Sequence, residues 1–97
     1  MKILKQEKQK LLKWVNDGKS IYYLLNYLVN DCKYSQPEAK EIIDNIDNIE
    51  IFENNNREYN MRKDGKSWFL EEYTDTECTF AVMGNSVPSC YSQMFFN

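Results

Sequence analysis

The fold depends most on residues 20–47, which read SIYYLLNYLVNDCKYSQPEAKEIIDNID. Their first half predicts a helix from Ile21 to about Asp31, because its apolar residues recur at the i, i+3, i+4, i+7 spacing of a core-facing stripe. The stripe consists of Ile21, Leu24, Leu25, Leu28 and Val29. Ser20 precedes it and is suited to cap the helix N-terminus by accepting a backbone hydrogen bond.

A second helix is predicted to start after Ser35. Ser35 and Glu38 have the spacing of a capping box, in which each side chain accepts from the backbone N–H of the other residue. Pro37 falls in the first turn, where a missing N–H costs nothing. The buried stripe would be Ala39, Ile42, Ile43 and Ile46. Two helices joined by a short turn indicate a helix-turn-helix unit.

Residues 3–16 predict a preceding helix with an apolar stripe, a lysine-rich surface and a stop at Gly18. After residue 47 the apolar period changes from 3.6 to 2. We expect four antiparallel strands at about 49–53, 57–63, 66–73 and 78–83. Their turns would be the Asn-rich residues 54–56, Asp64-Gly65 and residues 74–77.

The predicted strand registers agree on one apolar sheet face. This face would carry Ile49, Met61, Trp68 and Met83 in one row, and Ile51, Tyr59, Leu70 and Ala81 in the next. The predicted fold is therefore α+β, winged-helix-like, with three N-terminal helices packed on a four-stranded antiparallel meander. Residues 1–97 would form one domain, with a helical part at 3–48, the meander at 49–83 and a tail at 84–97.

The opposite sheet face holds Phe69, Phe80 and Val82, which need a cover. We expect Phe95 or Phe96 of the tail to pack there. A dimer or partner interface is the alternative cover.

Composition and charge place the chain in a broad class. It has 97 residues and a net charge of −3. The charge is uneven, at +4 over residues 1–20, −5 over 21–60 and −2 over 61–97. The frequent Asn, Lys and Ile residues are typical of an AT-rich genome, such as that of a low-GC bacterium or its phage. Three cysteines without a C-x-x-C pair, and no signal segment, predict a cytoplasmic protein with reduced thiols.

The sequence offers little for catalysis. Histidine is absent, which removes the commonest general base and metal ligand. The cysteines have no zinc-site spacing, and Gly18, Gly65 and Gly84 form no phosphate-binding loop. We therefore predict a non-enzyme with no cofactor, no metal site and no membrane association.

The element order of residues 3–63 resembles a winged helix-turn-helix domain. That resemblance implies a DNA-binding regulator whose third helix enters the major groove. However, the outward residues of this helix are mainly acidic, and phosphates repel them. In this alternative, the nucleic-acid contacts would be Arg57, Arg62, Lys63 and Lys66.

An acidic helix beside surplus tyrosines favours a protein partner with a basic surface. The predicted partner-binding residues are Glu38, Glu41, Asp44, Asp47, Tyr22 and Tyr27. Small acidic proteins of phages and mobile elements often block host nucleic-acid-handling or defence proteins in this way. An anti-CRISPR inhibitor and a nuclease immunity protein are two examples of the class. The oligomeric state is left open between monomer and homodimer.

Overall fold

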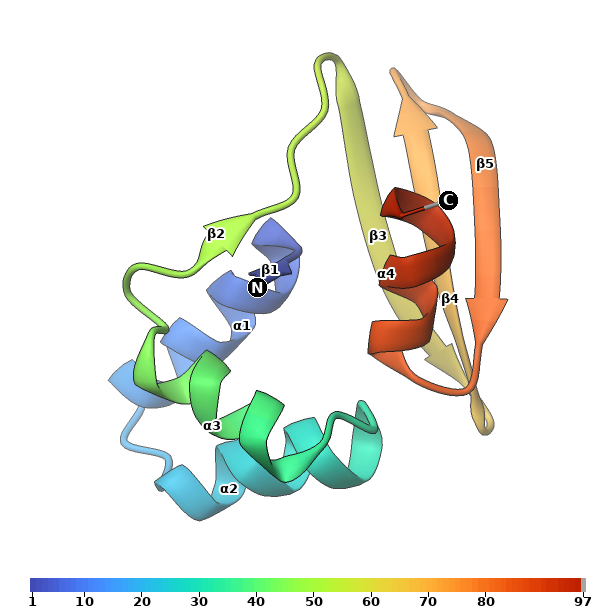
Figure 1. The fold of residues 1–97 in the computed structure, drawn as a ribbon. Coiled ribbons are helices and arrows are strands. Elements are labelled where there is room, and N and C mark those ends of the chain that lie inside the picture. Colours follow the sequence, from blue (N-terminus) through green and yellow to red (C-terminus); the bar gives the residue numbers. More distant parts are fainter. Residues whose placement is uncertain (97) are drawn as a thin grey trace. The chain divides into compact units, whose positions relative to one another are not determined.

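Three helices and two short strands make up the first of two compact units, Met1–Phe52 (Figure 1). Helix α1 spans Lys5–Asn16 and α3 spans Gln36–Asp44. Between them, α2 spans Ile21–Asn26 and continues as a π-helical turn, η1, over Tyr27–Asp31. The structure, a computed structural model, describes residues 1–96.

The predicted helix caps are confirmed. Ser20 Oγ accepts from the Tyr23 N–H at 3.2 Å at the start of α2. At α3, Ser35 Oγ accepts from the Glu38 N–H at 3.2 Å, and Glu38 Oε1 accepts from the Ser35 N–H at 3.0 Å. These reciprocal bonds satisfy backbone donors that a helix start otherwise leaves open.

The core of the first unit follows the predicted stripes. Its fully buried residues include Leu4, Leu11, Leu24, Leu28, Ala39 and Ile42. Lys8 ties α1 to the segment after α3, because its Nζ donates to the carbonyl oxygens of Asp47 (3.4 Å) and Ile49 (2.9 Å). Both acceptors lie between α3 and the next strand, so Lys8 holds that connection against α1.

In the second unit, Glu53–Asn97, the described residues 53–96 form a three-stranded antiparallel sheet with one helix on it. Strand β3 spans Arg57–Asp64, β4 spans Ser67–Thr74 and β5 spans Glu77–Gly84. They are ordered β3-β4-β5, and helix α4 follows at Val87–Phe95 (Figure 1). The two compact units do not test whether residues 1–97 form a single domain, so the single domain stays a prediction.

Helix α4 covers the sheet face that carries Tyr59, Met61 and Leu70. The Phe95 ring meets the Tyr59 ring edge-on at 5.0 Å between centroids. Met61, Trp68, Leu70, Val87, Cys90 and Tyr91 are buried. Gly84 permits this close packing, because a Cβ at that position would lie 2.8 Å from Ser89 Oγ.

The predicted fold class is wrong in its sheet and its helix count. Residues 1–96 form four α-helices and two separate sheets, instead of three helices on a four-stranded meander. The expected first strand is shortened to β2, Glu50–Ile51, which pairs in parallel with β1, Lys2–Ile3. The Phe52 N–H also donates to the Ile3 carbonyl at 2.9 Å. The prediction paired this strand with β3. In the structure, β2 pairs with the N-terminal strand β1 instead.

The predicted register of the β3–β4 hairpin is wrong by two residues. Met61 pairs with Leu70, not Trp68, and the loop consists of Gly65 and Lys66, because Asp64 pairs with Ser67. Gly65 supplies the positive φ of 63° at the first loop position. A shift of two keeps each residue on its face, so Met61 and Trp68 still lie on the same side.

The β4–β5 hairpin departs from its predicted register through a bulge. Near the turn, Thr74 pairs with Glu77 and Tyr73 with Cys78, but the next pair is Glu72 with Phe80, so Thr79 is extra. This insertion places Phe80 and Val82 on the α4 side, and Ala81 and Met83 on the opposite side. The tail prediction is therefore wrong for Phe69, which lies on the face opposite α4, whereas Phe80 and Val82 share the face on which Phe95 packs.

Candidate protein-binding surface

Three carboxylates of and just after α3 are exposed to solvent. Glu41, Asp44 and Asp47 make no ion pair with any residue in the described range 1–96. Glu38 differs, because its carboxylate is half-buried and accepts the Ser35 N–H. Of the four predicted acidic contacts, Glu38 therefore has a structural role, and the other three are available to a partner.

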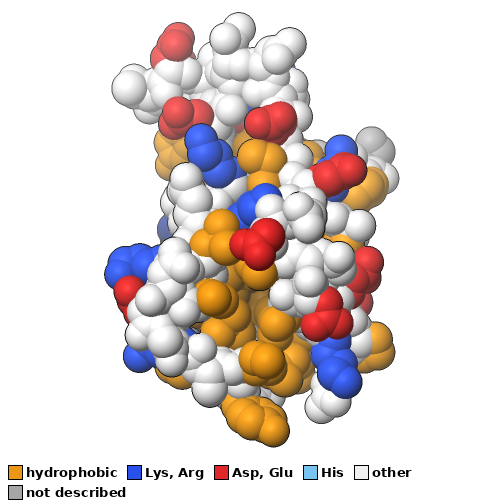
Figure 2. Space-filling model, turned by 90° about the vertical axis from the view of Figure 1, so that its left-hand side faces the viewer, with side chains coloured by type: hydrophobic (Ala, Val, Ile, Leu, Met, Phe, Trp, Pro, Cys, Tyr) orange, Lys and Arg blue, Asp and Glu red, His pale blue; other side chains and the backbone are white. Residues whose placement is uncertain are grey.

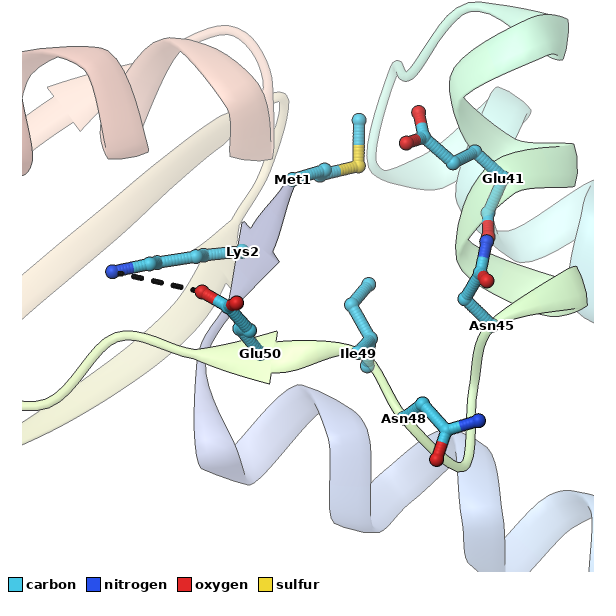
Figure 3. Close-up of a pocket in the computed structure, with 7 residues that line it drawn as sticks. All are labelled: Met1, Lys2, Glu41, Asn45, Asn48, Ile49 and Glu50. Carbon is cyan, nitrogen blue, oxygen red and sulfur yellow. Dashed lines mark hydrogen bonds and ion pairs between the residues drawn. The ribbon is translucent and has the colours of Figure 1, made fainter.

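A cleft of about 340 Å³ opens beside Glu41 (Figure 3). It is lined by Met1, Lys2, Glu41, Asn45, Asn48, Ile49 and Glu50. The Asn45 side-chain N–H donates to the Glu41 carbonyl at 2.8 Å, which leaves the Asn45 amide oxygen as an acceptor. Lys2 Nζ lies 4.0 Å from Glu50 Oε2, a loose and exposed ion pair. Carboxylates and amide oxygens around one cleft suit a cationic side chain that donates several hydrogen bonds.

Apolar side chains are exposed where α1 ends and α2 begins. Val15 is 45% exposed, Ile21 62%, Tyr22 82% and Tyr23 45%, and these four form what we call the apolar patch. In the lower half of Figure 2, hydrophobic side chains gather over the helical unit, with acidic and basic groups beside them. Ile21 was predicted to face the core, but its exposure shows that the buried stripe of α2 starts at Leu24.

Tyr27, also predicted to contact a partner, is instead bound inside the helical unit. Its hydroxyl donates to Glu7 Oε2 at 2.8 Å and accepts from Lys10 Nζ at 3.1 Å. The Trp14 ring meets its ring edge-on at 4.9 Å. Burial, followed by the nearby Glu7 carboxylate, raises the pKa of Tyr27 far above its ordinary value. The hydroxyl thus stays protonated and joins α1 to η1.

Glu7 was not singled out from the sequence. It is only 4% exposed, and its Oε1 accepts no hydrogen bond within residues 1–96, although Lys10 Nζ lies 3.7 Å away. The sequence signal for its burial was its spacing: Glu7 is three residues after Leu4 and four before Leu11, on the buried stripe itself.

The Cys32 thiol is buried near Glu7 and Tyr27. Burial raises the pKa of this thiol to about 12.

The basic residues that the DNA-binding alternative predicts as nucleic-acid contacts lie on different faces of the second unit. Arg57 Nη1 is 3.2 Å from Glu72 Oε1, and Arg62 Nε is 3.4 Å from Glu71 Oε1. Lys63 Nζ lies 5.7 Å from the centroid of the Trp68 ring, and Lys66 is exposed in the hairpin loop. Arg57 and Lys63 share the α4 side of β3, whereas Arg62 points to the opposite side.

Comparisons with protein-family models, with curated proteins and with solved structures find no match for this chain. Within residues 1–96, no group of three or more Cys, Asp or Glu side chains is placed to hold a metal ion. No helix in that range is long and apolar enough to cross a membrane.

Proposed function

We propose that this protein is a small non-catalytic interaction protein whose acidic α3 surface binds a basic surface of another protein. The partner would be a host nucleic-acid-handling or defence protein. The chain would come from a phage or mobile element and act as an inhibitor of anti-CRISPR or immunity type. The observation that carries the proposal is the exposure of the Glu41, Asp44 and Asp47 carboxylates, which have no cation paired to them in residues 1–96.

Such carboxylates favour association in two ways. They attract a basic partner before contact, which raises the association rate. They also remain hydrated until binding, so the partner's arginines and lysines provide the first ion pairs that they make. The cleft beside Glu41 offers room for one of these side chains.

The apolar patch supplies the second part of an interface. Charge pairs at a rim contribute little affinity on their own, whereas buried aromatic and aliphatic anchors carry most of it. Tyr22 is 82% exposed and Ile21 is 62% exposed, so both have area to bury against a partner.

The test replaces Glu41, Asp44 and Asp47 together by lysine and leaves Glu38 in its capping box. Its matched control replaces the exposed Glu53, Glu58 and Glu77 of the second unit by lysine. Both variants convert three negative charges into three positive ones, from the native net charge of −3. Each tagged protein would capture partners from an extract of the source cells, and the purified partner would then be titrated calorimetrically.

We expect the native chain and the control to bind one basic protein with similar affinity. The α3 variant should bind at least about tenfold more weakly, the equivalent of about 1.4 kcal/mol. A mobility shift with mixed duplex DNA, at low and moderate salt, tests the winged-helix regulator alternative. Salt-sensitive DNA binding by the native chain that survives the α3 reversal would replace our proposal by that alternative.

A further inference from the structure

The two edges of the sheet in the second unit differ in charge. Strand β3 is one edge, and five of its eight residues are charged. Strand β5 is the other edge, and Glu77 is the one charged residue among its eight. Exposed edges carry unpaired backbone groups, and charged side chains usually protect them from pairing with other strands. Strand β3 has that protection, whereas β5 has no charged residue after Glu77, and its bulge at Thr79 lies before the segment that starts at Phe80.

The unprotected part of β5 is rich in strand-forming residues. Residues 78–83 read CTFAVM, an uncharged run without Pro or Gly, of the kind that pairs readily with another strand. Phe80 is 52% exposed and Met83 57%, so the segment is accessible on both faces. Gln93 Nε2 donates to the Met83 carbonyl at 2.8 Å and closes the C-terminal end of this edge. The open portion is therefore centred on Ala81.

We propose that β5 pairs with β5 of a second copy in an antiparallel arrangement about a two-fold axis at Ala81. A two-fold axis normal to the sheet keeps each face of one copy continuous with the same face of the other. Phe80 then lies opposite Val82 of the second copy, and both lie on the α4 side. Glu77, the one charged residue of β5, lies four residues from the axis in each copy, so the two Glu77 side chains are at opposite ends of the pair and no like charges meet.

The charge pattern favours a second copy over a charged peptide as the occupant. An uncharged edge offers no cation or anion to select a charged strand, whereas it is complementary to itself in hydrophobicity and in backbone hydrogen bonding. The pairing joins two three-stranded sheets into one six-stranded sheet. It uses no residue of α3 and is independent of the proposed function.

Sedimentation equilibrium of the full chain under reducing conditions tests the proposal. We expect a weak dimer with a dissociation constant of about 100 μM, because the paired segment is short. Ala81→Lys places two lysines opposite each other at the axis and should weaken the dimer about tenfold or more. Asn60→Lys is the matched control, because it places a lysine on the same sheet face of the other edge strand. It should dimerise like the native chain.

A cross-link tests the register. In a chain carrying Cys78→Ser and Ala81→Cys, a short bis-maleimide reagent should give a covalent dimer, because directly opposed Cβ atoms lie only about 4.5–5.5 Å apart. Cys32 and Cys90 are buried and should not compete. A native chain that stays monomeric at all concentrations would overturn the proposal. A dimer that is unaffected by Ala81→Lys and is not cross-linked through position 81 would also overturn it.

Discussion

The hydroxyl of Tyr27 lies 2.8 Å from Glu7 Oε2 and donates a hydrogen bond to it, inside the helical unit. Glu7 comes from α1, and Tyr27 begins the π-helical turn that follows α2. A π-turn inserts one residue relative to an α-helix and so changes which side chains face the neighbouring element. Here, the π-helical turn provides Tyr27, whose hydroxyl binds the buried carboxylate of Glu7.

Replacing Tyr27 by phenylalanine should lower the free energy of unfolding by about 1–3 kcal/mol, because Glu7 Oε2 then loses its donor while it stays buried. Urea denaturation monitored by circular dichroism measures this change. Tyr22→Phe removes the same atom from a side chain that is 82% exposed, and it should leave the midpoint unchanged. Equal midpoints for the two variants would mean that the Tyr27–Glu7 bond contributes no net stability.

The Cys32 thiol makes stability depend on alkaline pH. Burial raises its pKa from 9.0 to about 12, so between these values the unfolded chain releases a proton that the folded chain keeps. The free energy of unfolding should therefore fall as pH rises through this window, by roughly 1 kcal/mol per pH unit from this group. Urea melts at pH 8 and pH 10.5 in a reducing buffer measure the difference.

The pKa of Tyr27 is also raised, and this lowers stability at alkaline pH in the same way. The comparison therefore needs a variant that removes only the contribution of Cys32. Cys32→Ala should be less stable at pH 8, because it leaves a cavity, but it should lose less stability between the two pH values. A loss equal to that of the native chain would assign the pH dependence to Tyr27 or to other groups. At pH 8, a thiol reagent should modify the exposed Cys78 well before Cys32.

The helices could be predicted because their signals are local. The Ser35–Glu38 box and the Ser20 cap lie within one turn of the residues that they bond, and both form as expected. The strand pairing depended on contacts between residues far apart in the sequence and on one inserted residue. β2 pairs with residues near the N-terminus, and the single extra residue at Thr79 moves Ala81 and Met83 to the other face. A period-2 pattern does not show where a bulge falls.

The candidate surface was predictable in charge but not in detail. Acidic residues spaced along α3 indicated an exposed face, and the three carboxylates of Glu41, Asp44 and Asp47 lie there. The sequence could not separate Tyr22 from Tyr27, because both are tyrosines on one predicted helix. Their roles differ because Glu7 and Trp14 of α1 reach Tyr27, while Tyr22 points to solvent.

Ser35→Ala should lower the free energy of unfolding by about 1 kcal/mol, because the Glu38 N–H loses its acceptor. The Glu38 side chain can still accept from the backbone of residue 35, so half of the box remains. Chemical denaturation of Ser35→Ala, Glu38→Ala and the double variant forms a cycle that measures the coupling between the two bonds. Strictly additive effects would show that the two bonds act independently.

Gly84→Ala should destabilise the second unit, because α4 approaches the end of β5 too closely for a side chain. A Cβ at residue 84 would lie 2.8 Å from Ser89 Oγ and 3.1 Å from Ser89 Cβ, so α4 or the strand would have to move. Overpacking of this kind typically costs about 1–3 kcal/mol. In a Ser89→Ala background the hydroxyl is gone and only the Cβ contact remains, so the same substitution should cost less. Hydrogen exchange of the α4 amides locates the effect: faster exchange in α4 with unchanged exchange in α1 and α3 is expected, and unchanged exchange in α4 would show that the contact relaxes without cost.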